Sequence, residues 1–150
     1  MLTIGELATF MATSARRARH ELKEETSHLL DGAVTEAKSL IGHELEEWAP
    51  LAPRTIAEKQ RLGYTGQVSE TDPLLRTGQL RDSIGRKVAE DFEGVVGEVG
   101  SDDRIAGYQE MGTSRIPPRP FLTPSMKSAE ARAPEGFGQA AVSLLVPAVR

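Results

Sequence analysis

The chain contains no cysteine among its 150 residues. Disulfide bonds, thiolate metal sites and cysteine nucleophiles are therefore excluded. No apolar run approaches the roughly 20 residues that a membrane-spanning helix needs. The positive charges near the start follow the apolar residues instead of preceding them, and Glu6 interrupts that apolar stretch. This order argues against a secretory signal.

Aromatic residues are also scarce, at 5% of the chain, so we expect a core made mostly of aliphatic residues and alanine. Hydrophobic residues make up 39% and charged residues 27%, which is typical of a globular protein of one domain. The net charge of −4 argues against a basic surface that binds DNA phosphates. It is compatible with a protein that lines a path through which DNA slides.

The N-terminal third predicts one long helix over residues 3–47. Thr3 followed by Glu6 forms a capping box. Gly32 and the polar residues before it favour a kink or a break between residues 26 and 32. The rest of the chain is too short to cover such a helix, so part of its apolar stripe is expected to contact another subunit. That stripe follows steps of three and four: Ile4, Leu7, Met11, Ala15, Ala18, Leu22, Leu29, Ala33, Ala37, Leu40 or Ile41, and Leu45.

A first distinctive segment runs from Trp48 to Lys59 and has the pattern W-x-P-L-x-P-x-T-I-x-x-K, which includes Leu51. Pro50 is expected to end the first helix, and Trp48 to cover its exposed end. Pro53 suits the first turn of a second helix that runs to about residue 62 and stops at the following glycine. The polar stretch 64–72 indicates a surface loop.

A second segment, residues 74–84, reads L-L-x-T-G-x-L-R-x-S-I and contains Thr77, Gly78, Leu80 and Arg81. Thr77 is predicted to cap a short helix over 78–84. A hairpin follows, with strands at 86–92 and 95–99 joined by a turn at 93–94. A lone hairpin is marginal in water, so helices must cover one face or neighbouring subunits must extend the sheet. The glycines at 94, 97 and 100 lie in the strand region, which indicates close backbone approach or a bulge and not a dinucleotide site.

A third segment, residues 108–124, is the most informative stretch, with the sequence YQEMGTSRIPPRPFLTP. A short helix capped by Ser101 or Asp102 is predicted to end at Met111, because Gly112 tolerates a left-handed backbone. The prolines at 117, 118 and 120 then give a stiff, extended connector, which we name the proline clip. Phe121 and Leu122 close it as apolar anchors. After it, residues 124–132 are predicted to be helical, Pro134, Gly136 and Gly138 to interrupt, and residues 139–149 to form a helix or a strand.

The sequence shows no catalytic constellation, and its few chemical motifs favour structural interpretations. His43 begins H-E-L-E-E, which lacks the second histidine of the zinc motif. His20 and His28 lie two turns apart without a third ligand. Residues 117–120 match P-x-x-P, but they lie between apolar anchors, which favours a clip over a peptide ligand. The basic cluster of residues 16, 17, 19, 20 and 23 alternates with glutamates, as in a solvated helix face. Glu110 and Arg119 flank the clip, and we predict a partly buried ion pair between them.

Together, the three segments resemble a small tail-completion, or head–tail joining, protein family of long-tailed bacteriophages. The third segment fits the signature G-T-S-R-x-P-P-R-P-F-L-x-P, and the first two match patterns of the same family in the same order. The resemblance covers residues 48–124, about half of the chain. Alanine stands at 52 where serine is usual, isoleucine at 105 where tyrosine is frequent, and methionine at 111 where an aromatic is usual. The residues that carry it are Trp48, Pro50, Leu51, Pro53, Thr77, Gly78, Leu80, Arg81, Tyr108, Glu110, Gly112, Thr113, Pro118, Arg119, Pro120 and Phe121.

The resemblance and the patterning predict one α+β domain: a long helix or helix pair at 1–47, a family-like core at 48–124 with a short antiparallel sheet at about 86–100, and a C-terminal element at 125–150. The resemblance implies a virion structural protein, made in the host cytoplasm, that assembles as a ring of six at the neck. It would join the head-side connector to the tail tube or its terminator, and DNA would pass without specific binding. No enzyme activity, cofactor, metal or membrane is expected. The alternatives are a tail terminator or other minor tail component, an adaptor that binds a host protein through residues 117–120, and a hydrolase.

Overall fold

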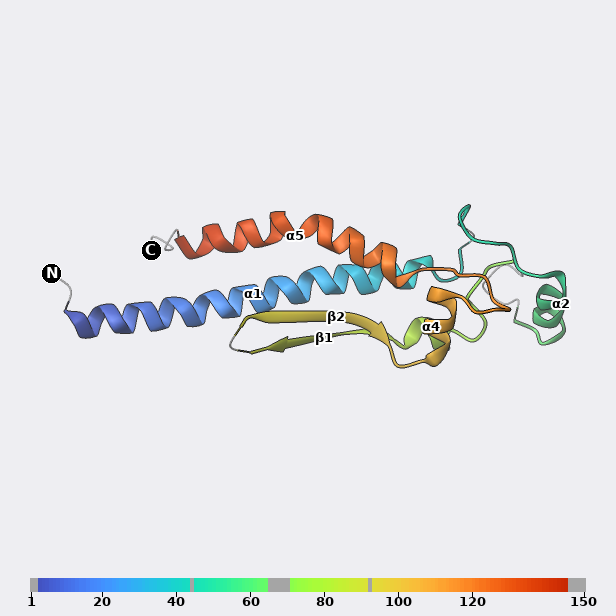
Figure 1. Cartoon of the computed structure of the whole chain (residues 1–150), viewed down its shortest axis with the longest axis horizontal. Helices are drawn as coiled ribbons and strands as arrows, with labels where there is room; N and C mark the ends of the chain where they lie inside the picture. The colour runs from blue at the N-terminus through green and yellow to red at the C-terminus, as the bar shows by residue number, and fades with distance from the viewer. Residues whose placement is uncertain (1–2, 44, 65–70, 92, 146–150) are drawn as a thin grey trace.

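The computed structural model describes residues 3–43, 45–64, 71–91 and 93–145. The molecule is elongated, with one long helix as its axis, a second helix running back along it, and a hairpin against another side (Figure 1). This arrangement confirms the predicted α+β class. The elements are α1 (Ile4–Leu40), α2 (Pro53–Arg61), α3 (Gln79–Asp82), β1 (Ile84–Glu90), β2 (Val95–Ser101), α4 (Arg104–Met111) and α5 (Leu122–Leu145).

Helix α1 begins at the predicted capping box, in which the Glu6 amide donates to the Thr3 hydroxyl and the Thr3 amide donates to the Glu6 carboxylate. The helix then continues without interruption to Leu40, so the predicted break near residues 26–32 is wrong. Gly32 serves a different purpose, because a Cβ there would lie 3.3 Å from the guanidinium of Arg132 on α5. The missing side chain leaves room for this guanidinium.

The end of α1 lies seven residues earlier than predicted, and Pro50 does not end it. Ile41 is extended, and Gly42 has a φ of +93°, a left-handed conformation that favours glycine. The amide of Gly42 donates to the carbonyl oxygen of Pro73 over 3.2 Å. The chain therefore leaves the helix at Gly42 and runs separately to Trp48, which is buried in the same apolar cluster as Ile41.

Helix α5 is one continuous helix of 24 residues, and the predicted interruption after residue 132 is wrong. Pro134 lies inside it, where it removes one backbone hydrogen bond, and the helix bends along its length in Figure 1. Gly136 lies against α1, because a Cβ there would overlap the carboxylate of Glu25. These residues fit the helix to its neighbour instead of ending it. Residues 146–149 of the predicted last element lie outside the described residues.

Strands β1 and β2 pair antiparallel, with Ile84 opposite Ser101 and Val88 opposite Gly97. The predicted hairpin is confirmed, although β1 already begins at Ile84 and Phe92 lies outside the described residues. Gly97 marks a close approach, as predicted: a Cβ there would lie 2.5 Å from a methyl carbon of Leu30. The hairpin thus packs directly onto α1.

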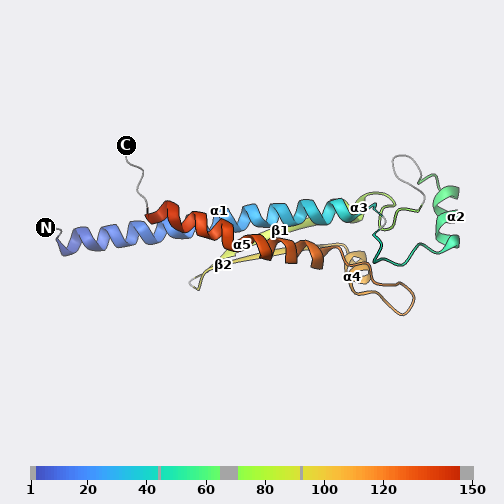
Figure 2. The same cartoon turned by 90° about the horizontal axis from the view of Figure 1, so that it is seen from above.

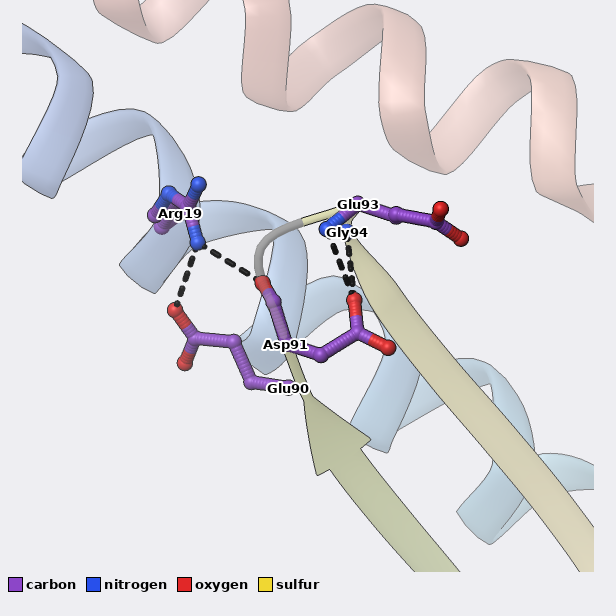
Figure 3. A network of polar contacts seen from close by, with 5 residues as sticks. All are labelled: Arg19, Glu90, Asp91, Glu93 and Gly94. Carbon is purple, nitrogen blue, oxygen red and sulfur yellow. Dashed lines mark hydrogen bonds and ion pairs between the residues drawn. The ribbon is translucent and has the colours of Figure 1, made fainter.

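Polar contacts also fix the hairpin to α1. The Arg86 guanidinium donates to the Asp31 carboxylate over 2.9 Å and lowers the pKa of Asp31. At the tip, Arg19 donates to the carbonyl oxygen of Asp91 over 2.9 Å and forms an ion pair with Glu90 at 3.6 Å (Figure 3). The Asp91 carboxylate in turn accepts the amides of Glu93 and Gly94, which closes the turn. Arg19 of the predicted basic cluster is therefore a hairpin anchor.

The main apolar cluster lies at the C-terminal end of α1, not along its length. It contains Ala37, Ile41, Trp48, Leu80, Ile84, Ala106 and Phe121. Its makeup is mostly aliphatic and alanine, as expected, with Trp48 and Phe121 as its aromatic members. At the N-terminal end of α1, the described residues do not cover the large apolar side chains: Ile4, Phe10 and Met11 are 88%, 65% and 62% exposed.

Candidate functional site

The three distinctive sequence segments meet at the C-terminal end of α1, and we name this the motif unit. Each segment contributes a buried side chain to the same apolar cluster: Trp48 from the first, Leu80 from the second and Phe121 from the third. Phe121 is fully buried. The segments are far apart in sequence but form one packed unit.

Arg119 joins the proline clip to the first segment. Its side chain is buried, and its guanidinium donates to the carbonyl oxygen of Ala49 over 2.7 and 3.2 Å and to that of Pro50 over 3.3 Å. Burial lowers the pKa of Arg119, but a guanidinium remains charged at physiological pH. Backbone carbonyls, not a carboxylate, are thus the partners of this cation.

The predicted ion pair between Glu110 and Arg119 is wrong, because Glu110 binds backbone amides instead. Its carboxylate accepts the backbone amides of Phe121, Leu122 and Thr123 over 2.8, 3.0 and 2.8 Å. These are amides of the first turn of α5, which have no partner within the helix. Burial raises the pKa of Glu110, but the hydrogen bonds from Thr123, Leu122 and Phe121 outweigh that effect and hold it below the ordinary value. Glu110 therefore caps α5 and fixes the helix to α4.

The loop between α4 and the prolines is a tight turn. Gly112 has a φ of +73°, as predicted, and a Cβ there would lie 2.9 Å from the backbone nitrogen of Pro118. The Thr113 amide donates to the carbonyl of Ile116 over 2.8 Å, and the Thr113 hydroxyl accepts the amide of Ile116 over 3.0 Å. This segment projects at the end of the molecule (Figure 2). The connector thus begins with a closed turn before it becomes extended.

The short helices differ from the prediction in their caps. Helix α2 begins at Pro53 as predicted, and its N-cap, Ala52, makes no side-chain hydrogen bond. The N-cap of α3 is Gly78 and not Thr77, although the Thr77 hydroxyl still accepts the amide of Gln79 over 3.3 Å. Helix α3 ends at Asp82, so the predicted helix over 78–84 was too long. Asp103, not Ser101 or Asp102, caps α4.

A cleft of about 430 Å³ lies beside the motif unit, lined by residues of α2, α3 and α4. Two of its polar groups were not singled out from the sequence. Lys59 is buried, and its ammonium donates to the carbonyl oxygen of Asp72 over 2.8 Å. The side-chain oxygen of Gln109 is buried and has no hydrogen-bond partner among the described residues. Lys59 closes the first sequence pattern and Gln109 lies in the third segment, but the sequence assigned neither residue a role.

The remaining candidate residues are exposed, half-buried or line the cleft. Leu51 lines the cleft, and Arg81 is exposed and pairs with its neighbour Asp82 at 3.6 Å. Pro50, Tyr108 and Pro118 are exposed, and Pro120 is half-buried. Within the described ranges, no group of three or more histidine or acidic side chains could hold a metal ion. In the same ranges, no helix is long and apolar enough to cross a membrane.

Comparison with known proteins gives no assignment. No family model matches the chain, and neither the curated proteins nor the solved structures contain a significant match. The fold, the contacts and the sequence patterns are therefore the basis for any statement about function.

Proposed function

We propose that this chain is a structural component of the neck of a long-tailed bacteriophage, a tail-completion or head–tail joining protein that assembles as a ring of six around the DNA channel. The observation that supports it is the junction of the three signature segments in one unit. Arg119 of the third segment binds the carbonyls of Ala49 and Pro50 in the first, and Leu80 of the second packs in the same cluster as Phe121. Segments of one family signature are expected to depend on each other in this way.

The uncovered surfaces are consistent with assembly. The described sheet has only two strands, and a two-stranded sheet is marginal without further cover. The apolar residues of α4 at positions 105, 108 and 111 are exposed as well. A subunit of a ring gains cover for such surfaces from its neighbours. The acidic net charge suits a channel that lets DNA slide without gripping it.

The alternatives have weaker support. A tail terminator or another minor tail component would share the same fold features and differ in position along the tail. An adaptor that presents Pro117–Pro120 as a peptide ligand is disfavoured, because Arg119 is only 5% exposed and is committed to backbone carbonyls. A hydrolase would need a nucleophile beside a base, and the described residues that line the cleft include no histidine and no serine.

The proposal can be tested by deleting the coding sequence from the phage or prophage genome that carries it. We expect lysates of the deletion strain to contain DNA-filled heads and separate tails by electron microscopy, and a plasmid copy to restore joined particles. The variant Arg119→Met should restore poorly, and the exposed control Arg115→Met should restore fully. Normal tailed particles in the deletion strain would refute the proposed function. Complete absence of tails would favour a terminator or another tail component.

A further inference from the structure

The first turns of α1, residues 3–15, form a free arm. The arm extends past the hairpin tip that Arg19 holds and past the described end of α5 in both views (Figures 1 and 2). Each of its residues is exposed, and Ile4, Leu7 and Met11 present large apolar side chains that are 88%, 47% and 62% exposed. A helix of this length is marginal on its own in water. A contiguous apolar face on it indicates a partner.

The spacing of the arm identifies the kind of partner. Ile4, Ala8, Met11 and Ala15 follow steps of four, three and four, which is the spacing of a coiled-coil seam. The arm's one charged side chain, Glu6, lies about 200° around the helix from Ile4, because each residue turns the helix by about 100°. The seam is therefore free of charge, and it fits a second helix.

We propose that the arm pairs antiparallel with the arm of a second copy of this chain, about a two-fold axis. In this register Ile4 lies opposite Ala15 of the second copy, and Ala8 lies opposite Met11. Every layer then sets one large side chain against one alanine, which fills the seam and lets the helices approach closely. A parallel pairing would set alanine against alanine in two layers and leave voids there.

The positions beside the seam fit the same two-fold axis. Leu7 faces Ser14 of the second copy, and Gly5 faces Ala12, so no like charges meet. The exposed large side chains of the seam and its flank offer on the order of 400 Å² per copy, if each large side chain has about 200 Å² when fully exposed. That is about half of one side of a standard interface. We therefore expect a weak dimer that forms at high protein concentration and does not depend on the ring.

The first experiment compares two substitutions at equally exposed positions. Met11 lies in the seam and Phe10 lies outside it, although they are 62% and 65% exposed. By size exclusion with light scattering, we expect the wild type to be dimeric at high concentration, Met11→Glu to be monomeric, and Phe10→Glu to remain dimeric. A wild type that is monomeric at its highest soluble concentration overturns the proposal, as do two variants with the same mass. A wild type that forms six-copy particles but neither a dimer nor paired particles overturns the arm contact and supports the proposed function.

The second experiment tests the register, since the chain has no cysteine of its own. A mixture of Ile4→Cys and Ala15→Cys proteins should form a disulfide-linked dimer on mild oxidation. Ile4→Cys alone should not, because the register separates the two copies of position 4 by eleven residues, about 16 Å along the helix axis. Disulfides need Cα atoms within roughly 7 Å. Efficient cross-linking of Ile4→Cys with itself would indicate a parallel pair and overturn the proposal.

Discussion

Replacement of Glu110 by glutamine should destabilise the protein, because one carboxylate holds the start of α5. One oxygen of Glu110 accepts the amides of Phe121 and Leu122, and the other accepts the amide of Thr123. Glutamine has a single acceptor oxygen, so its amide group must face at least one of these donors. The substitution therefore leaves a helix amide without a partner and also removes a negative charge from the N-terminal end of the helix dipole.

The expected magnitude follows from these two losses. Loss of an N-terminal cap typically costs about 1 kcal/mol. Loss of a charge that complements the helix dipole costs a further ~0.3–1 kcal/mol. Because Glu110 is half-buried and water reaches part of the site, we expect a total decrease of about 1–2 kcal/mol in the free energy of unfolding at neutral pH.

The pH dependence carries a sign that can be checked. The folded-state pKa of Glu110 is lowered from 4.5, so the ionised carboxylate contributes stability above that value. The contribution is lost as the pH falls through the folded-state pKa. The difference between wild type and Glu110→Gln should therefore be constant between pH 7 and about pH 5.5 and shrink at more acidic pH.

Urea unfolding followed by circular dichroism at a series of pH values measures this difference. The matched control is Glu130→Gln, a substitution of an exposed carboxylate on the same helix, which should change the unfolding free energy by less than about 0.5 kcal/mol. If Glu110→Gln were as stable as the wild type at pH 7, or if the difference grew on acidification, the capping role would be refuted.

Three further substitutions test the packing. Gly97→Ala should lower the free energy of unfolding by about 1–3 kcal/mol, because its Cβ would lie 2.5 Å from a buried leucine of α1. The control Gly100→Ala, whose Cβ would point into open space, should change it little. Equal losses in urea unfolding would contradict the close approach. Arg119→Met should lower the free energy of unfolding by about 1–3 kcal/mol, because it removes the donors to two backbone carbonyls. The exposed control Arg115→Met should remain near the wild type. Equal melting temperatures of the two variants would contradict the role of Arg119 as a donor. Pro134→Ala should raise the melting temperature, because an interior proline costs about 3 kcal/mol relative to alanine; a decrease would show that the contact with α1 requires the bend.

Local signals in the sequence were sufficient for the elements that depend on local chemistry. The capping box at Thr3, the proline at the first turn of α2 and the positive φ of Gly112 all lie where the sequence predicts them. The alternating pattern and its turn also predicted the hairpin. In each case the physical cause lies within about four residues of the feature, so a single sequence contains it.

Several of the errors share one cause: the role of the residue depends on an element that is distant in the sequence. Gly32 and Gly136 looked like helix breakers, but each makes room for a side chain of the facing helix, Arg132 and Glu25 respectively. Both helices continue through these glycines despite their low helix propensity. The same holds for Glu110, whose partners lie eleven to thirteen residues away and include no side-chain cation. The opposite charges of Glu110 and Arg119 in one segment suggested an ion pair. In the structure each of these side chains binds backbone groups instead.

The burial of the signature residues bears on where partners are recognised. Trp48, Leu80, Arg119 and Phe121 are each at most 7% exposed, so these residues specify how the motif unit folds and are not available to a partner. Recognition must then depend on exposed residues around the unit. Helix α4 offers such a surface, since its apolar residues at positions 105, 108 and 111 are 48%, 51% and 80% exposed and follow each other at helical spacing. Charged substitutions there should disturb assembly while folding is retained, whereas substitutions of the four buried signature residues should disturb both.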